Sequence, residues 1–236
     1  MTAVLAADSW LVADGRARAV ERHWARFAAT CREHGVTPDA LAAFRAEVQR
    51  ALPARGRWFP RIELRADGEL ALELRPAPPR EPVVVAWVAD VPDPRVAPRR
   101  KGPDLERLGA LRGRAAVHGA GEAVIADADG RLLEGAYTSL LWWEGETLCA
   151  VPDDAPILPG ITRALLLELA SDRGTPVMLR RPAPRELADR ETWLVSALHG
   201  IRVVTAWANG GPPAGGAPHA DGWQRLLDGL TARQSV

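Results

Sequence analysis

Four pairs of an acidic residue and a glycine divide the chain and constrain how it can fold. They are Asp14-Gly15, Asp67-Gly68, Asp129-Gly130 and Glu144-Gly145. Each pair stands between two segments typical of β-strands, and on both sides of Asp67-Gly68 apolar and polar residues alternate. Because glycine adopts positive φ without steric cost, such pairs favour the tight turns of β-hairpins. The chain is therefore predicted to contain four hairpins.

Predicted helices are interspersed with these hairpins. They cover residues 20–34, 38–52, 104–115, 161–173, 183–190 and 221–231. Pro38 stands near the first turn of one helix, and Gly35 and Gly174 stand where helices end. The apolar segment 83–89 is predicted to be a buried strand. Hairpins mixed with isolated helices predict an α+β fold rather than a doubly wound sheet.

A proline-rich segment at residues 90–104 predicts a boundary between two domains. We therefore expect a small N-terminal α/β domain at residues 1–92 and a larger C-terminal domain at residues 99–236. The glycine- and proline-rich segment 208–219 is expected to be a loop.

Composition and missing motifs exclude several classes of protein. The 30 basic and 30 acidic residues argue against a nucleic-acid-binding protein, which carries a basic excess. No apolar run reaches the roughly 18 residues of a membrane helix, and the N-terminus lacks the basic start of a signal peptide. The two cysteines and five histidines match no metal-ligand spacing, and no phosphate-binding loop or hydrolase motif occurs. We expect a cytoplasmic protein that acts on a small molecule, without a metal, nucleic acid or membrane partner.

Lysine is almost absent from the chain, because 29 of the 30 basic residues are arginines and only Lys101 is a lysine. Arginine replaces lysine well on a solvated surface. It cannot replace lysine where a neutral amine must attack a carbonyl, because guanidinium does not deprotonate in proteins. Lys101 is therefore a candidate for chemistry, although a surface lysine retained by chance explains the count equally well.

Three segments and Lys101 together resemble a known family. The segments are HWARF at residues 23–27, LEGAYTSLLWW at residues 133–143 and PILPGITRALLLELA at residues 156–170. In this order they resemble the fold-type IV pyridoxal-phosphate enzymes, which include branched-chain and D-amino-acid aminotransferases and aminodeoxychorismate lyase. The resemblance implies a two-domain fold, pyridoxal 5'-phosphate as cofactor and a homodimer.

The resemblance also implies roles for individual residues. Lys101 matches the lysine that forms the Schiff base, and Glu134 matches the glutamate that contacts the pyridine nitrogen and keeps it protonated. Arg26 corresponds to the arginine that holds the cofactor phosphate, because guanidinium pairs well with phosphate. Ile161 and Thr162 match the helix start that binds the same phosphate. His23, beside Arg26 in HWARF, is interpreted as structural.

Two further segments favour the lyase branch of the family. VSALHGIRVV at residues 195–204 resembles the lyase version of a strand pair, with Ser196 and Ala197 at cofactor-binding positions, and Ser196 replaces the usual asparagine. Counting back from Asp14-Gly15, Ser9 falls on the catalytic threonine of the lyase, so that a hydroxyl is kept. The implied activity is that of 4-amino-4-deoxychorismate lyase, which forms 4-aminobenzoate and pyruvate for folate synthesis.

Two alternatives remain open. One is an aminotransferase that acts on D- or branched-chain amino acids with the same cofactor. The other is a cofactor-free relative that serves in binding or assembly. The contacts to a substrate carboxylate are not assigned by the resemblance, and the arginines that qualify are Arg61, Arg99, Arg100 and Arg202. Arg99 and Arg100 are also adjacent charges that would lower the pKa of Lys101.

Overall fold

The computed structural model describes residues 3–233, which form two compact units. Unit 1 comprises residues 3–79, 100–103 and 228–233, and unit 2 comprises residues 80–99 and 104–227. The predicted domains divide the chain differently at three places, residues 80–92, 100–103 and 228–233. Residues 80–92 carry a strand of the unit 2 sheet, whereas the short segment around Lys101 packs with unit 1.

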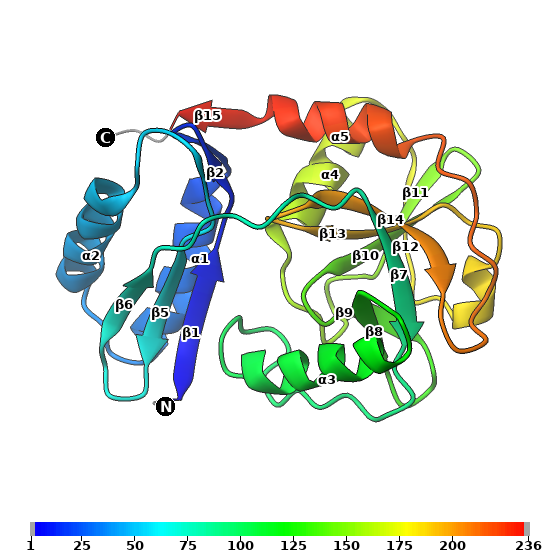
Figure 1. Cartoon of the computed structure of the whole chain (residues 1–236), viewed down its shortest axis with the longest axis horizontal. Coiled ribbons are helices and arrows are strands. Elements are labelled where there is room, and N and C mark those ends of the chain that lie inside the picture. The colour runs from blue at the N-terminus through cyan, green and yellow to red at the C-terminus, as the bar shows by residue number, and fades with distance from the viewer. Residues whose placement is uncertain (1–2, 234–236) are drawn as a thin grey trace. The chain divides into compact units, whose positions relative to one another are not determined.

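Unit 1 contains two small antiparallel sheets (Figure 1). The first has the strand order β1-β5-β6, formed by β1 (Val4–Ser9), β5 (Arg61–Arg65) and β6 (Leu70–Glu73). The second has the order β15-β3-β2-β4, formed by β15 (Thr231–Arg233), β3 (Arg16–Arg18), β2 (Val12–Ala13) and β4 (Arg57–Trp58). The hairpins predicted at Asp14-Gly15 and Asp67-Gly68 are both confirmed, because β2 pairs with β3 and β5 with β6.

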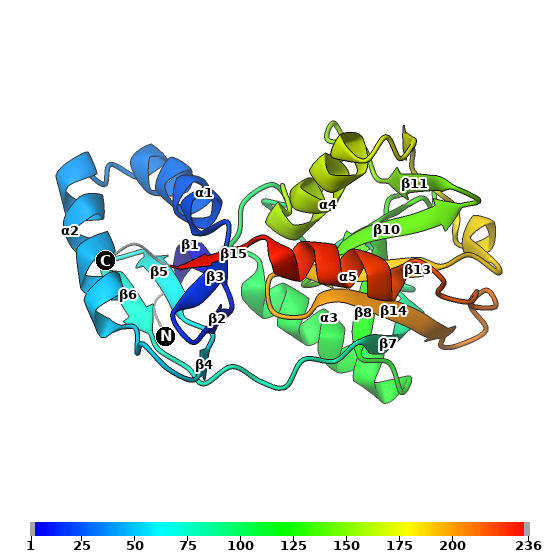
Figure 2. The same ribbon diagram turned by 90° about the horizontal axis from the view of Figure 1, so that it is seen from above.

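Helices α1 (Val20–Glu33) and α2 (Pro38–Ala51) complete unit 1 (Figures 1 and 2). The hydroxyl of Thr37 accepts a hydrogen bond from the backbone of Ala40 and so caps α2, whose first residue is Pro38. Apolar side chains of both helices share one core with the β1-β5-β6 sheet. Its fully buried members include Phe27, Cys31, Val48, Ile62 and Leu64. This packing fixes α1 against β1, the strand that carries Asp8.

Unit 2 is built on one eight-stranded sheet with the order β12-β11-β10-β13-β14-β7-β8-β9. In chain order the strands are β7 (Val83–Val88), β8 (Glu122–Ala126), β9 (Leu132–Gly135), β10 (Ser139–Glu144), β11 (Thr147–Ala150), β12 (Val177–Leu179), β13 (Thr192–Ser196) and β14 (Gly200–Trp207). Antiparallel pairing of Ser139 with Glu134 also joins β10 to β9. The strands from β10 round to β9 therefore form a closed six-stranded ring, and Glu134 lies where it closes.

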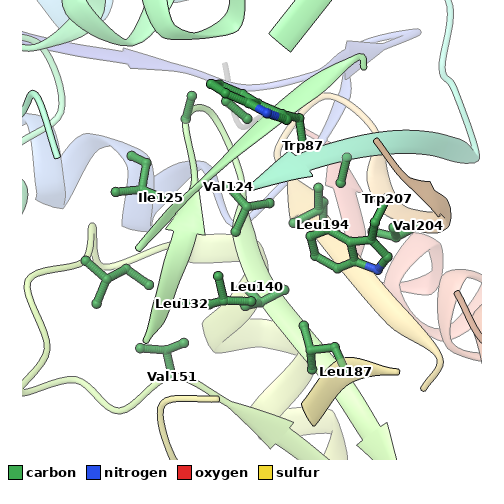
Figure 3. Packing of buried hydrophobic residues seen from close by; sticks show 14 of the residues in the cluster. Trp87, Val124, Ile125, Leu132, Leu140, Val151, Leu187, Leu194, Val204 and Trp207 are labelled. Carbon is green, nitrogen blue, oxygen red and sulfur yellow. The ribbon is translucent and has the colours of Figure 1, made fainter. Parts of the chain in front are cut away.

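The core of unit 2 lies between the ring strands. Every ring strand contributes at least one buried apolar side chain, among them Ala86, Val124, Leu132, Leu140, Leu194 and Val204. Figure 3 shows several of these side chains gathered in the interior. Helix α3 (Leu105–Val117) packs on β8, and α4 (Ile161–Asp172) packs on β10 and β13. Trp223 of α5 (Ala220–Gly229) contacts the rings of Trp143 and Trp193.

The α+β class predicted from the hairpins and helices is confirmed. The predicted helix at residues 183–190 is only a short 3₁₀ turn, Pro184–Leu187, and the last helix ends at Gly229. Strand β15, which follows that helix, was not predicted. Of the helices in the described part of the chain, none has both the length and the apolar character needed to span a bilayer.

Candidate active site

Asp8 lies at the centre of a buried polar cluster in unit 1. Its side chain is fully buried on β1. Arg26 of α1 donates from Nε to Oδ2 and from Nη2 to Oδ1, each at 2.9 Å. Nδ1 of His23 lies 2.7 Å from Oδ1, and the backbone N–H of Ser9 donates to the same oxygen at 2.8 Å. His23 and Arg26 reach one carboxylate because residues three apart share a helix face.

The charges of this cluster are fixed by its contacts. Burial alone raises the pKa of a carboxyl, but the charge of Arg26 and the hydrogen bond from His23 bring the pKa of Asp8 well below its usual range. The pKa of His23 lies below its usual value, because burial, Arg26 and Lys101 lower it while Asp8 raises it. An ionised Asp8 therefore accepts a hydrogen bond from the Nδ1–H of a neutral His23.

Lys101 is fastened to the strand that carries Asp8. Its carbonyl accepts a hydrogen bond from the backbone N–H of Ala7 at 2.8 Å. Gly102 has φ +137° and packs so tightly on β1 that a Cβ there would lie 2.8 Å from Cα of Ala6. A side chain at residue 102 would push the segment off the strand. The only lysine of the chain is thus held in unit 1 beside the Asp8 cluster.

Ser9 is the last residue of β1 and is almost fully buried. Successive side chains of a strand leave opposite faces. The Ser9 hydroxyl therefore leaves the face opposite to Asp8, and only the Ser9 backbone takes part in the Asp8 cluster. This strand geometry separates the hydroxyl from the arginine–carboxylate pair.

Glu134 of β9 is a buried carboxylate of unit 2. Nη1 of Arg95 and the backbone N–H of Leu158, at 2.8 Å, both donate to its Oε1. Arg95 also donates to both carboxylate oxygens of Asp93 and, at 2.9 Å, to the carbonyl of Pro156. Burial raises the pKa of Glu134 to about 7, although Arg95 and the hydrogen bond from Leu158 act to lower it.

Helix α4 begins at Ile161, three residues after Leu158, whose backbone N–H binds Glu134. Gly160 precedes the helix, and a Cβ there would lie 2.2 Å from Oγ of Ser139, so a larger residue would displace that hydroxyl. No side chain in the described part of the chain caps α4, and its first turn holds no acidic residue. Ile161 and Thr162 are buried there. Uncapped N–H groups without a neighbouring carboxylate fit an anion such as a phosphate.

Ser196 and Ala197 lie where β13 turns into β14. Oγ of Ser196 accepts a hydrogen bond from the backbone N–H of His199 at 3.2 Å, which closes the turn. Nδ1 of His199 in turn accepts from the backbone N–H of Glu81 at 3.1 Å. The turn is therefore held rigidly at one end of the ring, although no contact on it identifies a ligand.

The four arginines considered for a substrate carboxylate all have partners in the structure. Arg61 pairs with Glu63, and Arg100 pairs with Glu33. Arg99 donates to the carbonyls of Asp153 and Ala155, and the buried Arg202 pairs with Glu122. Arg61, Arg100 and Arg202 therefore each have an acidic partner, whereas the partners of Arg99 are backbone carbonyl oxygens.

Sequence reasoning missed two residues of these buried clusters. Asp8 was not selected, although an acidic residue inside the apolar segment VLAADSWLV signals a buried carboxylate that needs a partner. Arg95 was not distinguished from 28 other arginines. His23, interpreted as structural, shares Asp8 with Arg26. The described residues contain no group of three or more His, Cys, Asp or Glu that could hold a metal ion.

Comparison with known proteins agrees with this fold. The family model for class IV aminotransferases matches residues 5–207. A hypothetical aminotransferase from Mycobacterium tuberculosis, in a PLP-bound form, is 25% identical with a TM-score of 0.80, over 95% of this chain and 87% of that one. The chain therefore belongs to the class IV aminotransferase family.

Two more distant structures share the fold. One is a provisionally assigned 4-amino-4-deoxychorismate lyase from Legionella pneumophila, 17% identical with a TM-score of 0.80, over 95% of this chain and 90% of that one. The other is a branched-chain aminotransferase from Thermoproteus uzoniensis, 18% identical with a TM-score of 0.80, over 95% and 86%. The search of curated proteins found no match.

Proposed function

We propose that the chain is a pyridoxal 5'-phosphate enzyme that cleaves 4-amino-4-deoxychorismate into 4-aminobenzoate and pyruvate. The family match and the PLP-bound relative support the cofactor. The observation that carries the proposal is the anchoring of Lys101, the only lysine, on β1 beside a buried arginine–carboxylate pair. An amine held in this way suits covalent attachment of an aldehyde cofactor.

Taken separately, the residues of each unit fit parts of the cofactor. In unit 1, Lys101 would supply the amine and Arg26 suits the phosphate. In unit 2, the uncapped start of α4 also suits a phosphate, and the buried Glu134 suits the ring nitrogen. Arg95 and the backbone of Leu158 both donate to Oε1 of Glu134, so Oε2 would be the acceptor for a protonated ring nitrogen. When bound, the cofactor supplies an electron sink for a carbanion next to the substrate nitrogen.

Lys101 and Ser9 move the protons in the proposed reaction. The Lys101 amine removes the proton from C4 of the substrate. The bond between C3 and the ether oxygen breaks, and the departing enolpyruvyl group receives a proton from the Ser9 hydroxyl to become pyruvate. The aromatic ring formed in the product supplies the driving force. The hydroxyl is held nearly buried at the end of β1, as a positioned acid requires.

An aminotransferase is the second candidate. It is favoured by the hypothetical aminotransferase from Mycobacterium tuberculosis, 25% identical, whose structure is also known with α-ketoglutarate and PMP. A transaminase must bind a second oxo acid, and three of the four arginines considered for that carboxylate are already paired with an acidic side chain. For that reason we place the lyase first.

Two assays on the purified protein test the proposal. Borohydride reduction followed by peptide mass analysis should place the cofactor on Lys101, and a cofactor-loaded protein without this label would contradict the assignment. The loaded protein should release pyruvate from aminodeoxychorismate made in situ. Amino-group transfer to an oxo acid without pyruvate release would instead establish the second candidate. A protein that binds no cofactor would support a binding or assembly role.

Ser9 provides a test specific to the lyase. Ser9→Ala should lower pyruvate release by about 10²-fold, the scale of one acid–base group, and leave cofactor binding unchanged. Ser9→Thr keeps the hydroxyl and should retain much of the activity. Full activity in Ser9→Ala would remove Ser9 from the mechanism. We further propose that the enzyme is a homodimer, which sedimentation equilibrium would measure.

A further inference from the structure

The carboxylate of Asp8 is fully buried and takes part in no step of the proposed reaction. It nevertheless accepts four hydrogen bonds. Oδ1 accepts from Nη2 of Arg26, from Nδ1 of His23 and from the backbone of Ser9, and Oδ2 accepts from Nε of Arg26. Two of these bonds are donated by the guanidinium of Arg26, and they form a parallel pair. Such a pair fixes the plane of a guanidinium as well as its place.

The pair also fixes the orientation of Arg26. The edge formed by Nε and Nη2 faces Asp8, so the guanidinium plane is set by the plane of that carboxylate. Arg26 is held on α1 with only 15% of its side chain exposed. An arginine side chain that is already immobilised loses little rotamer entropy when it binds a ligand.

His23 keeps the carboxylate turned toward Arg26. Its ring is buried and lies tilted against Trp10, at a centroid distance of 5.8 Å. From that fixed place Nδ1–H holds Oδ1, while the backbone of Ser9 holds the same oxygen from the strand. The carboxylate is thus fixed from the helix and from the strand before any ligand binds.

We propose that Asp8 is a positioning residue that fixes Arg26 for the phosphate group of the cofactor, so that the enzyme selects the phosphorylated form of pyridoxal. This inference rests on the proposed function. It assigns to the carboxylate a role in binding rather than in the reaction.

The experiment compares the affinities for pyridoxal 5'-phosphate and for pyridoxal, which lacks the phosphate, by absorbance titration of the apoprotein. Asp8→Asn keeps the shape of the side chain but turns an N–H₂ group toward a guanidinium donor, which breaks the parallel pair. It should weaken pyridoxal 5'-phosphate binding about three- to tenfold, the scale of one immobilised side chain, and leave pyridoxal binding unchanged. In an Arg26→Ala background, Asp8→Asn should have no further effect on either ligand.

Glu63→Gln is the matched control, because Glu63 also pairs with an arginine, Arg61, on a strand of the same sheet. It should change neither affinity. Equal weakening of both ligands by Asp8→Asn would show a structural role and overturn the inference, and so would unchanged binding of both. A wild-type protein that binds neither ligand would overturn the proposed function itself.

Arg26→Lys keeps the test decisive if Asp8→Asn fails to fold. A lysine keeps the positive charge but cannot be held by two parallel bonds. In this variant the ratio of the affinity for pyridoxal 5'-phosphate to that for pyridoxal should therefore fall by the same factor, about three- to tenfold. An undiminished preference in Arg26→Lys would overturn the inference, because charge without fixed orientation would then suffice.

Discussion

Asp8 in unit 1 and Glu134 in unit 2 are both buried carboxylates that accept hydrogen bonds from an arginine and from a backbone N–H. Their pKa values nevertheless shift in opposite directions. The pKa of Asp8 lies well below its usual range, whereas burial raises the pKa of Glu134 to about 7. The presence of an arginine neighbour therefore does not decide the charge of a buried carboxyl.

The difference lies in how each arginine distributes its donors. Arg26 gives two parallel hydrogen bonds to Asp8, and His23 adds a third side-chain donor. Arg95 gives Glu134 one donor and directs others to Asp93, whose own negative charge raises the pKa of Glu134. A shared arginine stabilises each anion less than an undivided one does. Unit 1 thus holds a permanent anion, and unit 2 holds a carboxyl that titrates near neutral pH.

The largest expected effect of this difference is on stability. Asp8→Ala leaves Arg26 as a mostly buried charge without its carboxylate, which should lower the free energy of unfolding by about 3–5 kcal/mol. Glu134→Ala should cost less, about 1–3 kcal/mol, because Arg95 keeps its bonds to Asp93. Urea denaturation of the two variants measures both values. An equal or larger loss in Glu134→Ala would contradict this account of the two arginines.

A smaller effect is expected on cofactor affinity. Arg26→Ala should weaken pyridoxal 5'-phosphate binding by roughly ten- to a hundredfold, the value of a charge-assisted contact of about 1.5–3 kcal/mol. High added cofactor should restore activity. Arg95→Ala should weaken pyridoxal 5'-phosphate and pyridoxal alike, because it acts through Glu134. Unchanged cofactor retention in Arg26→Ala would show that this arginine has no part in binding.

The smallest effect is on the pH dependence of stability. The pKa of Glu134 is raised from 4.5 to about 7, so the folded chain holds an extra proton between these values. This stabilisation is complete below pH 4.5 and is lost as the pH rises through 7, by up to about 2 kcal/mol between pH 5 and 7. Glu134→Gln should remove that loss. Asp8 acts in the opposite sense, because its stabilisation is lost only as the pH falls below the usual aspartate range.

Denaturation of the wild type and Glu134→Gln at pH 5, 6 and 7 tests this sign. The two proteins should differ in slope over this interval and converge in their response to acid below pH 4. Parallel profiles from pH 5 to 7 would show that Glu134 is ionised throughout.

Most of the local structure could be predicted, because turns, caps and helix starts are encoded by neighbouring residues. Asp67-Gly68, Thr37-Pro38 and Gly160-Ile161 each mark an element boundary that the structure confirms. β15 has no such signal, since Thr231–Arg233 is a short segment that becomes a strand only by pairing with β3. The ring closure at Glu134 and Ser139 likewise depends on packing among distant strands.

The site could be predicted only where a residue type is rare or lies in an ordered pattern. Lys101 is unique, and Glu134 and Ile161 lie in recognisable segments. Asp8 and Arg95 belong to common residue types, and their importance comes from burial and from the choice of partner, which are tertiary properties. The resemblance thus predicted Arg26 and Glu134, but their charged partners Asp8 and Arg95 were found only in the structure.

The segment 100–103 carries the lysine within unit 1, while the chain on both sides of it belongs to unit 2. No single contiguous piece of the gene therefore encodes unit 1, which also takes residues 228–233 from the far end. A chimera that takes residues 3–79 from a relative would keep its own segment 100–103. That segment would then have to pack on the β1 of the relative, including the tight contact at Gly102. Recombination should therefore succeed only where β1 and residues 100–103 still pack together. We expect these two stretches to evolve together.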